Sequence, residues 1–356
     1  MKPALQRAHS FCERFGLRLP ILLAPMAGAS APSLSIAVAN AGGAGACGAL
    51  LMQPPEIAAW VKEVRSATNG PFNMNLWIPD PPPQRDRTHE ARVRQFLAEW
   101  GPEVPENAGD ATPPDFAEQC QALLDLKPPI VSSVMGLYPP EFVAKLQGRG
   151  ILYFANISTV GEARQAEAAG ADVVVAQGME AGGHRGCFRA EDAERSMVGL
   201  FALIPAVVDA VKVPVVATGG IADARGVAAA LALGASAAQV GSAFLVCPEA
   251  KINPTWVQGL LSAAPEDTVV SRVFSGRPGR SLLTDYVRAA TSPSAPPPAP
   301  YPVQRGHTAQ MRSQAQKAND LQRMQAWAGQ SSGLAKAEPA ADVVRKLWEG
   351  AQQILA

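Results

Sequence analysis

Short apolar runs recur along the chain and alternate with stretches in which apolar residues return every three or four positions. The runs predict eight buried β-strands, at residues 21–24, 44–47, 72–76, 130–134, 151–155, 173–176, 213–217 and 238–240. Helical patterns fall between them at residues 31–41, 56–65, 141–147, 159–169, 198–211 and 222–233. Continuous apolar strands that alternate with helices are typical of a parallel sheet buried on both faces. Eight such units in about 250 residues predict an α/β fold, a (β/α)8 TIM barrel.

Two segments do not follow this alternation. Residues 79–114 are rich in proline and charge, with a short helix expected around residues 92–100. Residues 251–356 contain the linker SPSAPPPAPYP, followed by helical patterns at 308–328 and 341–355. We therefore expect a barrel formed by residues 1–78 and 115–250. Residues 79–114 and 251–356 are expected to form a smaller helical lobe that covers the barrel mouth.

Charge and cysteine content narrow the class of protein. The 356 residues include 31 Lys+Arg and 31 Asp+Glu, so no net charge favours a nucleic acid or an anionic membrane as partner. The uncharged stretch between Arg18 and Glu56 is interrupted by glycine and proline, which argues against a membrane span. The start of the chain shows no export signal, and five scattered cysteines suggest neither a disulfide framework nor a metal site. We expect a cytoplasmic protein; the sequence leaves open whether it forms a homodimer.

Glycines follow the last two predicted strands. Gly219 and Gly220 come after the seventh strand, and Gly241 and Ser242 after the eighth. A residue without a Cβ leaves its backbone N–H groups accessible, and TIM barrels commonly bind phosphate with these two loops. The alternative is that the glycines only form turns. The spacing favours phosphate binding and does not indicate which phosphate compound is bound.

A histidine follows the sixth predicted strand in the sequence Gly182-Gly183-His184. The two glycines allow close approach of a flat ligand, and an imidazole can donate, accept or transfer a proton. The alternative is a structural loop histidine, which is how we interpret His9, His89 and His307, because none of them follows a barrel strand. The context favours His184 as a catalytic residue. Cys187 lies three residues further on and has no assigned role.

At these loops the sequence resembles the nitronate monooxygenases, formerly called 2-nitropropane dioxygenases, and in particular their bacterial class I. The matching segments are PILLAPMAGAS (20–30), NMNLW (73–77), VVVAQGMEAGGHRG (173–186), VPVVATGGIADARGVAAALALGASAAQVGSAFL (213–245), YPVQRG (301–306) and RMQAWAGQ (323–330). The resemblance spans nearly the whole chain, and AQGMEAGGHRG is its most specific part. It implies a TIM barrel that binds FMN across the barrel mouth.

The resemblance also implies roles for individual residues. Those expected to hold the phosphate end of FMN are Gly219, Gly220, Gln239, Val240, Gly241 and Ser242. Those expected to line the ring and the ribityl chain are Ala24, Pro25, Met26, Asn75, Gln177, Gly182 and Gly183. His184 matches the catalytic histidine of the family, and Tyr301 falls where the family has an aromatic residue of the substrate pocket. An ordinary packing role is the alternative for Tyr301.

By this resemblance the protein is an oxidoreductase that converts alkyl nitronates and O2 to a carbonyl compound and nitrite. His184 would stabilise the anionic nitronate, or act as a base if neutral nitroalkanes are accepted. Relatives often carry a histidine after the fourth strand and a lysine after the conserved tyrosine; here the fourth strand leads into Val134-Met135-Gly136 and the lysine is not evident. Two further possibilities are a flavin-dependent NAD(P)H reductase of quinones or enoyl-acyl carrier proteins, and a barrel that acts on phosphosugars without a flavin.

Overall fold

Eight parallel strands form a nearly closed barrel at the centre of the molecule. The computed structural model describes residues 2–356. The strands run in the order β1-β9-β8-β6-β5-β4-β3-β2. Leu22 and Ala44 form a parallel bridge between the first and last members of this order. The predicted α/β barrel is confirmed, and the eight strands are β1 (Ile21–Leu23), β2 (Gly45–Gly48), β3 (Phe72–Trp77), β4 (Ile130–Val134), β5 (Leu152–Ile157), β6 (Val173–Gln177), β8 (Val215–Thr218) and β9 (Ala237–Val240).

The barrel strands are buried on both faces. Every residue of β2, β3, β6, β8 and β9 is buried. Side chains that face outward pack under the helices, and side chains that face inward fill the barrel. Most strands therefore appear in the sequence as largely apolar runs, whereas in β3 Asn73 and Asn75 alternate with apolar residues.

A layer of helices surrounds the barrel. Most begin where the sequence predicts, and several begin at a side-chain cap: Thr159 accepts from the N–H of Glu162, and Asp223 accepts from the N–H groups of Arg225 and Gly226. The layer also contains α5, which the sequence patterns did not predict. Its helices are α2 (Pro32–Ala41), α3 (Pro54–Ala67), α5 (Phe116–Leu126), α6 (Pro140–Gln147), α7 (Val160–Ala168), α8 (Leu200–Val208) and α9 (Ala224–Ala232).

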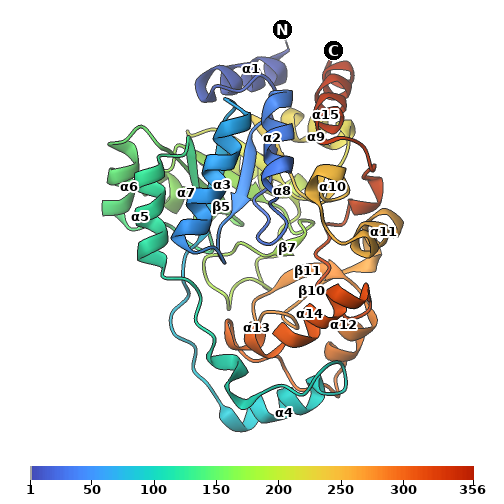
Figure 1. The fold of residues 1–356 in the computed structure, drawn as a ribbon. Helices are drawn as coiled ribbons and strands as arrows, with labels where there is room; N and C mark the ends of the chain where they lie inside the picture. Colours follow the sequence, from blue (N-terminus) through green and yellow to red (C-terminus); the bar gives the residue numbers. More distant parts are fainter. Residues whose placement is uncertain (1) are drawn as a thin grey trace.

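The ends of the barrel differ. At the N-terminal end of the strands, α1 (Pro3–Phe15) packs Phe11 and Phe15 against the barrel residue Phe154. Figure 1 shows the helices of a lobe gathered at the opposite end. These helices are α4 (Arg87–Leu97), η1 (Glu106–Asp110), α12 (Asp285–Ala290), α13 (Val303–His307) and α14 (Ala309–Ala318). A separate apolar cluster that includes Val93, Phe274 and Tyr286 holds the lobe together.

Between the lobe and the barrel lies a small antiparallel sheet that the sequence patterns did not predict. Its order is β10 (Thr268–Ser271), β11 (Gly279–Leu282) and β7 (Gly183–His184). Because β7 belongs to the loop after β6, this sheet links the lobe directly to the barrel mouth. Short connecting elements complete the chain: α10 (Ser242–Leu245), η2 (Pro248–Ala250), α11 (Pro254–Ser262), η3 (Pro265–Asp267) and η4 (Ser332–Leu334).

Part of the expected lobe lies elsewhere. The final helix, α15 (Ala340–Leu355), packs against α9 and α2 on the outer wall of the barrel, where Val344 and Leu347 join the barrel's apolar core. Residues 340–355 therefore do not cover the mouth, although the sequence led us to expect this for all of residues 251–356. The helical pattern at 308–328 also ends early, because Asn319 adopts a left-handed conformation after α14. No helix within residues 2–356 is long and apolar enough to cross a membrane.

Candidate functional site

A cavity of about 240 Å³ opens at the C-terminal ends of the barrel strands, beneath the lobe. Most residues that the sequence predicts for the site line it together: Ala24, Pro25, Met26, Asn75, Gln177, Gly182, Gly183, His184, Gly219, Gly220, Gln239, Gly241 and Ser242. Two do not. Val240 is buried in the apolar core, and Tyr301 lies behind the cavity wall, stacked on the lining residue Trp77 with ring centroids 4.8 Å apart. The functional roles of all these residues stay predictions.

One end of the cavity is built from glycine backbone. Gly219 and Gly220 have φ values of +109° and +67°, a conformation that side chains disfavour. Gly241 follows β9, and the hydroxyl of Ser242 accepts a hydrogen bond from the N–H of Gly329 at 2.9 Å. The carboxylate of Asp223 already caps the nearby helix α9, so the loops and not that helix terminus supply free N–H groups. This end suits an anionic group such as a phosphate.

The middle of the cavity is narrow because two backbone segments approach each other closely. A Cβ on Gly182 would lie 2.5 Å from the backbone nitrogen of Gly329, so only glycine fits there. Gln177 holds the loop that follows it: its amide nitrogen donates to the His184 carbonyl at 3.1 Å, and its amide oxygen accepts from the Gly186 N–H at 2.7 Å. Small, uncharged walls next to an anion cradle fit a flat cofactor that ends in a phosphate. The residues present are therefore compatible with FMN.

The other end of the cavity is aromatic and contains His184. The imidazole lies between Trp77 and Trp327, with ring centroids 4.8 Å from each. Its Nε2 is 2.8 Å from the hydroxyl oxygen of Ser275, which lies 91 residues further along the chain. Pairing of β7 with β11 places His184 opposite Gly279. The lobe therefore fixes the imidazole, although the loop that carries it belongs to the barrel.

Electrostatics keep this imidazole neutral. Burial, together with the positive charges of Arg277, Arg305 and Arg312, lowers the pKa of His184 to about 3. At neutral pH the ring therefore has one N–H donor and one nitrogen lone pair. In the tautomer with its proton on Nδ1, Nε2 of His184 accepts from the Ser275 hydroxyl, and Nδ1–H is the donor that the ring can offer to a ligand.

Several lining residues were not predicted from the sequence. Some belong to the barrel strands and the loops that follow them, such as Ser132, Met135 and Asn156. Others come from the chain after residue 250 and from the loop after β2, and they are Leu50, Leu51, Trp256, Arg305, Gln325, Trp327, Gly329 and Ser331. The segments YPVQRG and RMQAWAGQ contributed to the family resemblance, but their residue types do not by themselves indicate a cavity wall. No local periodicity connects them to the strand ends, because the lobe brings them there.

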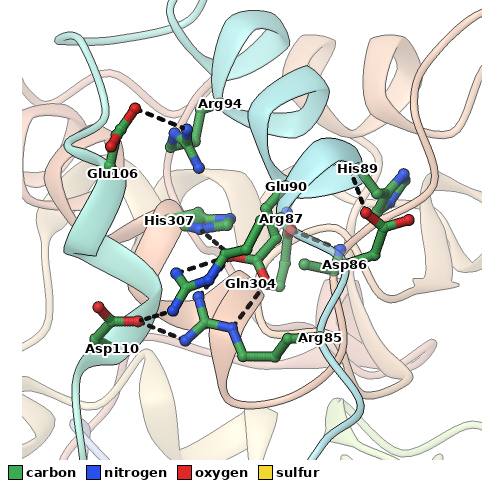
Figure 2. Close-up of polar contacts among 11 residues, drawn as sticks. Arg85, Asp86, Arg87, His89, Glu90, Arg94, Glu106, Asp110, Gln304 and His307 are labelled. Atoms are coloured by element: carbon green, nitrogen blue, oxygen red, sulfur yellow. Dashed lines mark hydrogen bonds and ion pairs between the residues drawn. The ribbon is translucent and has the colours of Figure 1, made fainter.

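Helix α13, which carries Arg305, packs against η1 of the 79–114 insertion, next to a cluster of paired charges within that insertion (Figure 2). Arg85 donates to the Glu90 carboxylate from Nε at 2.8 Å and to Asp110 from Nη1 at 2.5 Å. Nε2 of His307 lies 3.8 Å from Oε2 of Glu90, and the side chains of both residues are at most 1% exposed. We call Arg85, Glu90, Asp110 and His307 the seam. The packing of α13 on η1, beside the seam, fixes the backbone of the lining residue Arg305.

Comparisons with known proteins agree with this architecture. The family model described as nitronate monooxygenase matches residues 10–350. A nitronate monooxygenase of Paraburkholderia phytofirmans is 38% identical over 338 residues, which is 93% of this chain and 92% of the relative. A solved nitroalkane oxidase from Streptomyces ansochromogenes is 37% identical with a TM-score of 0.88, covering 96% of this chain and 98% of that one. The structure of FabK from Thermotoga maritima is 28% identical with a TM-score of 0.75, covering 97% and 96%.

Proposed function

The chain belongs to the nitronate monooxygenase family and is an oxidoreductase, and on this premise we propose that it uses FMN and O2 to convert alkyl nitronates to a carbonyl compound and nitrite. One observation supports this most: a single cavity combines a glycine-built anion cradle with a neutral imidazole between two tryptophans. When bound, the flavin supplies the redox chemistry, and the protein supplies position and electrostatics.

The cofactor would be held by residues of this chain at both of its ends. N–H groups at Gly219, Gly220 and Gly241, with the Ser242 hydroxyl, would bind the phosphate, and Gln239 and Val240 would contribute from β9. Ala24, Pro25, Met26, Asn75, Gln177, Gly182 and Gly183 would line the ring and the ribityl chain. A Cβ on Gly182 would lie 2.5 Å from the backbone nitrogen of Gly329, so no side chain fits between these two segments of the cavity wall.

His184 would act on the substrate as a neutral group. Its pKa of about 3 makes the ring a weak base, far below the range that suits removal of the α-proton of a nitroalkane near neutral pH. Of the two roles considered for His184, the structure therefore supports hydrogen bonding to an already ionised nitronate over proton abstraction. Tyr301 would shape the substrate pocket indirectly, by fixing Trp77 through its stacked ring.

The test is a nitrite assay on the purified protein. We expect yellow protein with flavin absorbance, and nitrite release in air from propane-2-nitronate that greatly exceeds release from neutral 2-nitropropane. Purified protein that neither contains nor takes up FMN would instead support a barrel that acts on phosphosugars. Flavin-containing protein that releases no nitrite from a series of alkyl nitronates would contradict the proposal.

A reductase on the same scaffold is the second candidate, and the similarity to FabK favours it over a phosphosugar enzyme. Anaerobic mixing separates the reductase from the monooxygenase. Rapid bleaching of the flavin by NADH or NADPH would indicate a reductase, whereas bleaching only by a nitronate supports the monooxygenase. A cytoplasmic location and a homodimer stay predictions, which cell fractionation and analytical ultracentrifugation test.

A further inference from the structure

The cavity wall carries one permanent charge. Among the residues that line it, Arg305 and His184 alone have ionisable side chains, and neither aspartate nor glutamate is present. Since the imidazole of His184 is neutral at physiological pH, the guanidinium of Arg305 is the cation available to a ligand. An anion in this cavity therefore has Arg305 as its counter-charge.

The other arginines near His184 are already engaged. Arg277 pairs with Asp80 through two hydrogen bonds of 2.8 and 2.6 Å. Arg312 donates to Gln325, to Thr308 and to the carbonyl of Arg305. For Arg305, the hydrogen bonds among residues 2–356 use the backbone carbonyl oxygen, which accepts from Thr308 and Arg312, and leave the guanidinium free.

The backbone of Arg305 is fixed although its side chain is unpaired. It lies in α13, which packs against η1 and places His307 beside the Glu90 carboxylate (Figure 2). Arg312 also donates to its carbonyl oxygen at 2.9 Å. A guanidinium on a rigid backbone loses less conformational freedom when it binds an anion, and its planar donors match a two-oxygen group such as a nitronate.

Arg305 belongs to the imidazole end of the cavity and not to the glycine end. Its positive charge acts to lower the pKa of both the His184 imidazole and the Tyr301 hydroxyl. Gly219 and Gly220, by contrast, lie against Ala181 and Glu180. A substrate group beside the imidazole is thus within the influence of Arg305, whereas the phosphate end of a cofactor has its own donors.

We propose that Arg305 binds the two oxygens of the nitronate group and makes the site selective for the anionic nitronate over the neutral nitroalkane. This inference rests on the proposed function and adds a specificity residue to it. The neutral His184 contributes one hydrogen bond, and Arg305 contributes the charge. Replacing the guanidinium should therefore weaken substrate binding much more than it changes the maximal rate.

The experiment compares Arg305→Gln, Arg305→Lys and the control Arg345→Gln, which removes a charge from the outer helix α15. With propane-2-nitronate we expect Arg305→Gln to raise KM by about 10- to 100-fold, the usual range for a lost hydrogen bond to a charged group. We expect kcat to stay within a few-fold and Arg305→Lys to restore part of the affinity. Arg345→Gln should match the wild type.

A binding measurement does not depend on turnover. Isobutyrate has the shape and charge of propane-2-nitronate, and isobutyramide is its neutral counterpart. The dissociation constant of isobutyrate, followed by the flavin absorbance of the holoenzyme, should rise with Arg305→Gln as KM does, and isobutyramide should bind both forms equally. FMN content should be the same in all variants.

The outcomes separate the two proposals. Unchanged KM and unchanged isobutyrate affinity in a holoenzyme that still releases nitrite would overturn the role of Arg305 and leave the proposed function intact. Loss of FMN from both Arg305 variants would also overturn it, because the residue would then belong to the cofactor site. If the wild type released no nitrite, the proposed function would fail, and isobutyrate binding alone would decide whether Arg305 binds anions.

Discussion

His184 and His307 are both enclosed by protein and surrounded by arginines, and burial lowers the pKa of each imidazole. Their surroundings are otherwise opposite. His184 lines the cavity and shares a hydrogen bond with Ser275. His307 lies in the seam, where neither ring nitrogen has a hydrogen-bond partner within residues 2–356. His184 therefore faces a cavity that a ligand can fill, whereas His307 is packed against Gly109 and Glu90.

The comparison shows that a perturbed pKa does not by itself identify a reactive group. In the seam, the buried carboxylate of Glu90 is neutralised by Arg85, so the charges compensate each other within the 79–114 insertion. At the cavity, the cation of Arg305 has no counter-ion within residues 2–356. An uncompensated charge beside a cavity indicates a ligand of opposite charge, whereas a compensated cluster indicates structure.

The largest effect on kcat should come from replacing His184, and replacing His307 in a separate variant provides the comparison. We expect His184→Asn to lower kcat for nitrite release by roughly 10²- to 10³-fold, the usual cost of losing one preorganised hydrogen-bond donor at a reacting anion. The control is His307→Asn, which should lower kcat by no more than a few-fold. Both variants should retain FMN, as measured by absorbance. Equal losses in the two variants would remove the distinction between cavity and seam.

Disrupting the charge pairs of the seam should lower the free energy of unfolding and leave the rate of the reaction unchanged. Glu90→Gln leaves Arg85 without its buried partner, and we expect a loss of about 2 kcal/mol in the free energy of unfolding. That is less than the ~3–5 kcal/mol for a fully buried pair, because Arg85 is 22% exposed and keeps Asp110. Asp342→Asn, which breaks the exposed pair with Arg345, should cost under about 0.5 kcal/mol. Urea unfolding of both variants tests this; an unchanged midpoint for Glu90→Gln would show that the seam contributes nothing.

Alanine substitutions at two glycines, one beside His307 of the seam and one in the cavity wall, compare the same two regions through their packing. A Cβ at Gly109 would lie 2.8 Å from Nε2 of His307, and one at Gly182 would lie 2.5 Å from the nitrogen of Gly329. Both alanine variants should lose about 1–3 kcal/mol of stability through overpacking. Only Gly182→Ala should also weaken FMN binding, by about tenfold or more. Flavin titration of both proteins measures this, and equal FMN affinity in the two would contradict the position assigned to the cofactor.

The smallest effect is a dependence of stability on pH. A histidine whose pKa is lowered on folding stays neutral in the native state and becomes protonated in the unfolded state. Stability is therefore complete above the usual pKa of 6.5 and falls as the pH drops below it, for His184 down to about 3. Each histidine can add up to about 1.4 kcal/mol per pH unit. Urea unfolding at about pH 7.5 and about pH 5.5 should show the loss, and His307→Gln should reduce it. An equal loss in that variant would show that His307 does not contribute.

The barrel and the existence of a helical lobe could be predicted from local patterns, whereas the pairing that joins the lobe to the barrel mouth could not. All eight strands were placed to within two or three residues, because each is a mostly apolar run followed by a break. The antiparallel pairing of His184 with Gly279 has no such signature: β7 consists of Gly183 and His184 alone, and its partner lies almost a hundred positions away. Helix α5 was missed because it directly follows the proline-rich insertion.

The sequence by itself determined the barrel, the glycines at its strand ends and the position of His184 after the sixth strand. Those features depend on residues that are neighbours along the chain. The tertiary structure alone decided that Ser275, Arg305 and Trp327 meet at the cavity, that His184 is neutral there, and that the similarly enclosed His307 faces no cavity. The physical reason is that solvation, charge and packing depend on distance in space, and the lobe brings together groups that no sequence period relates.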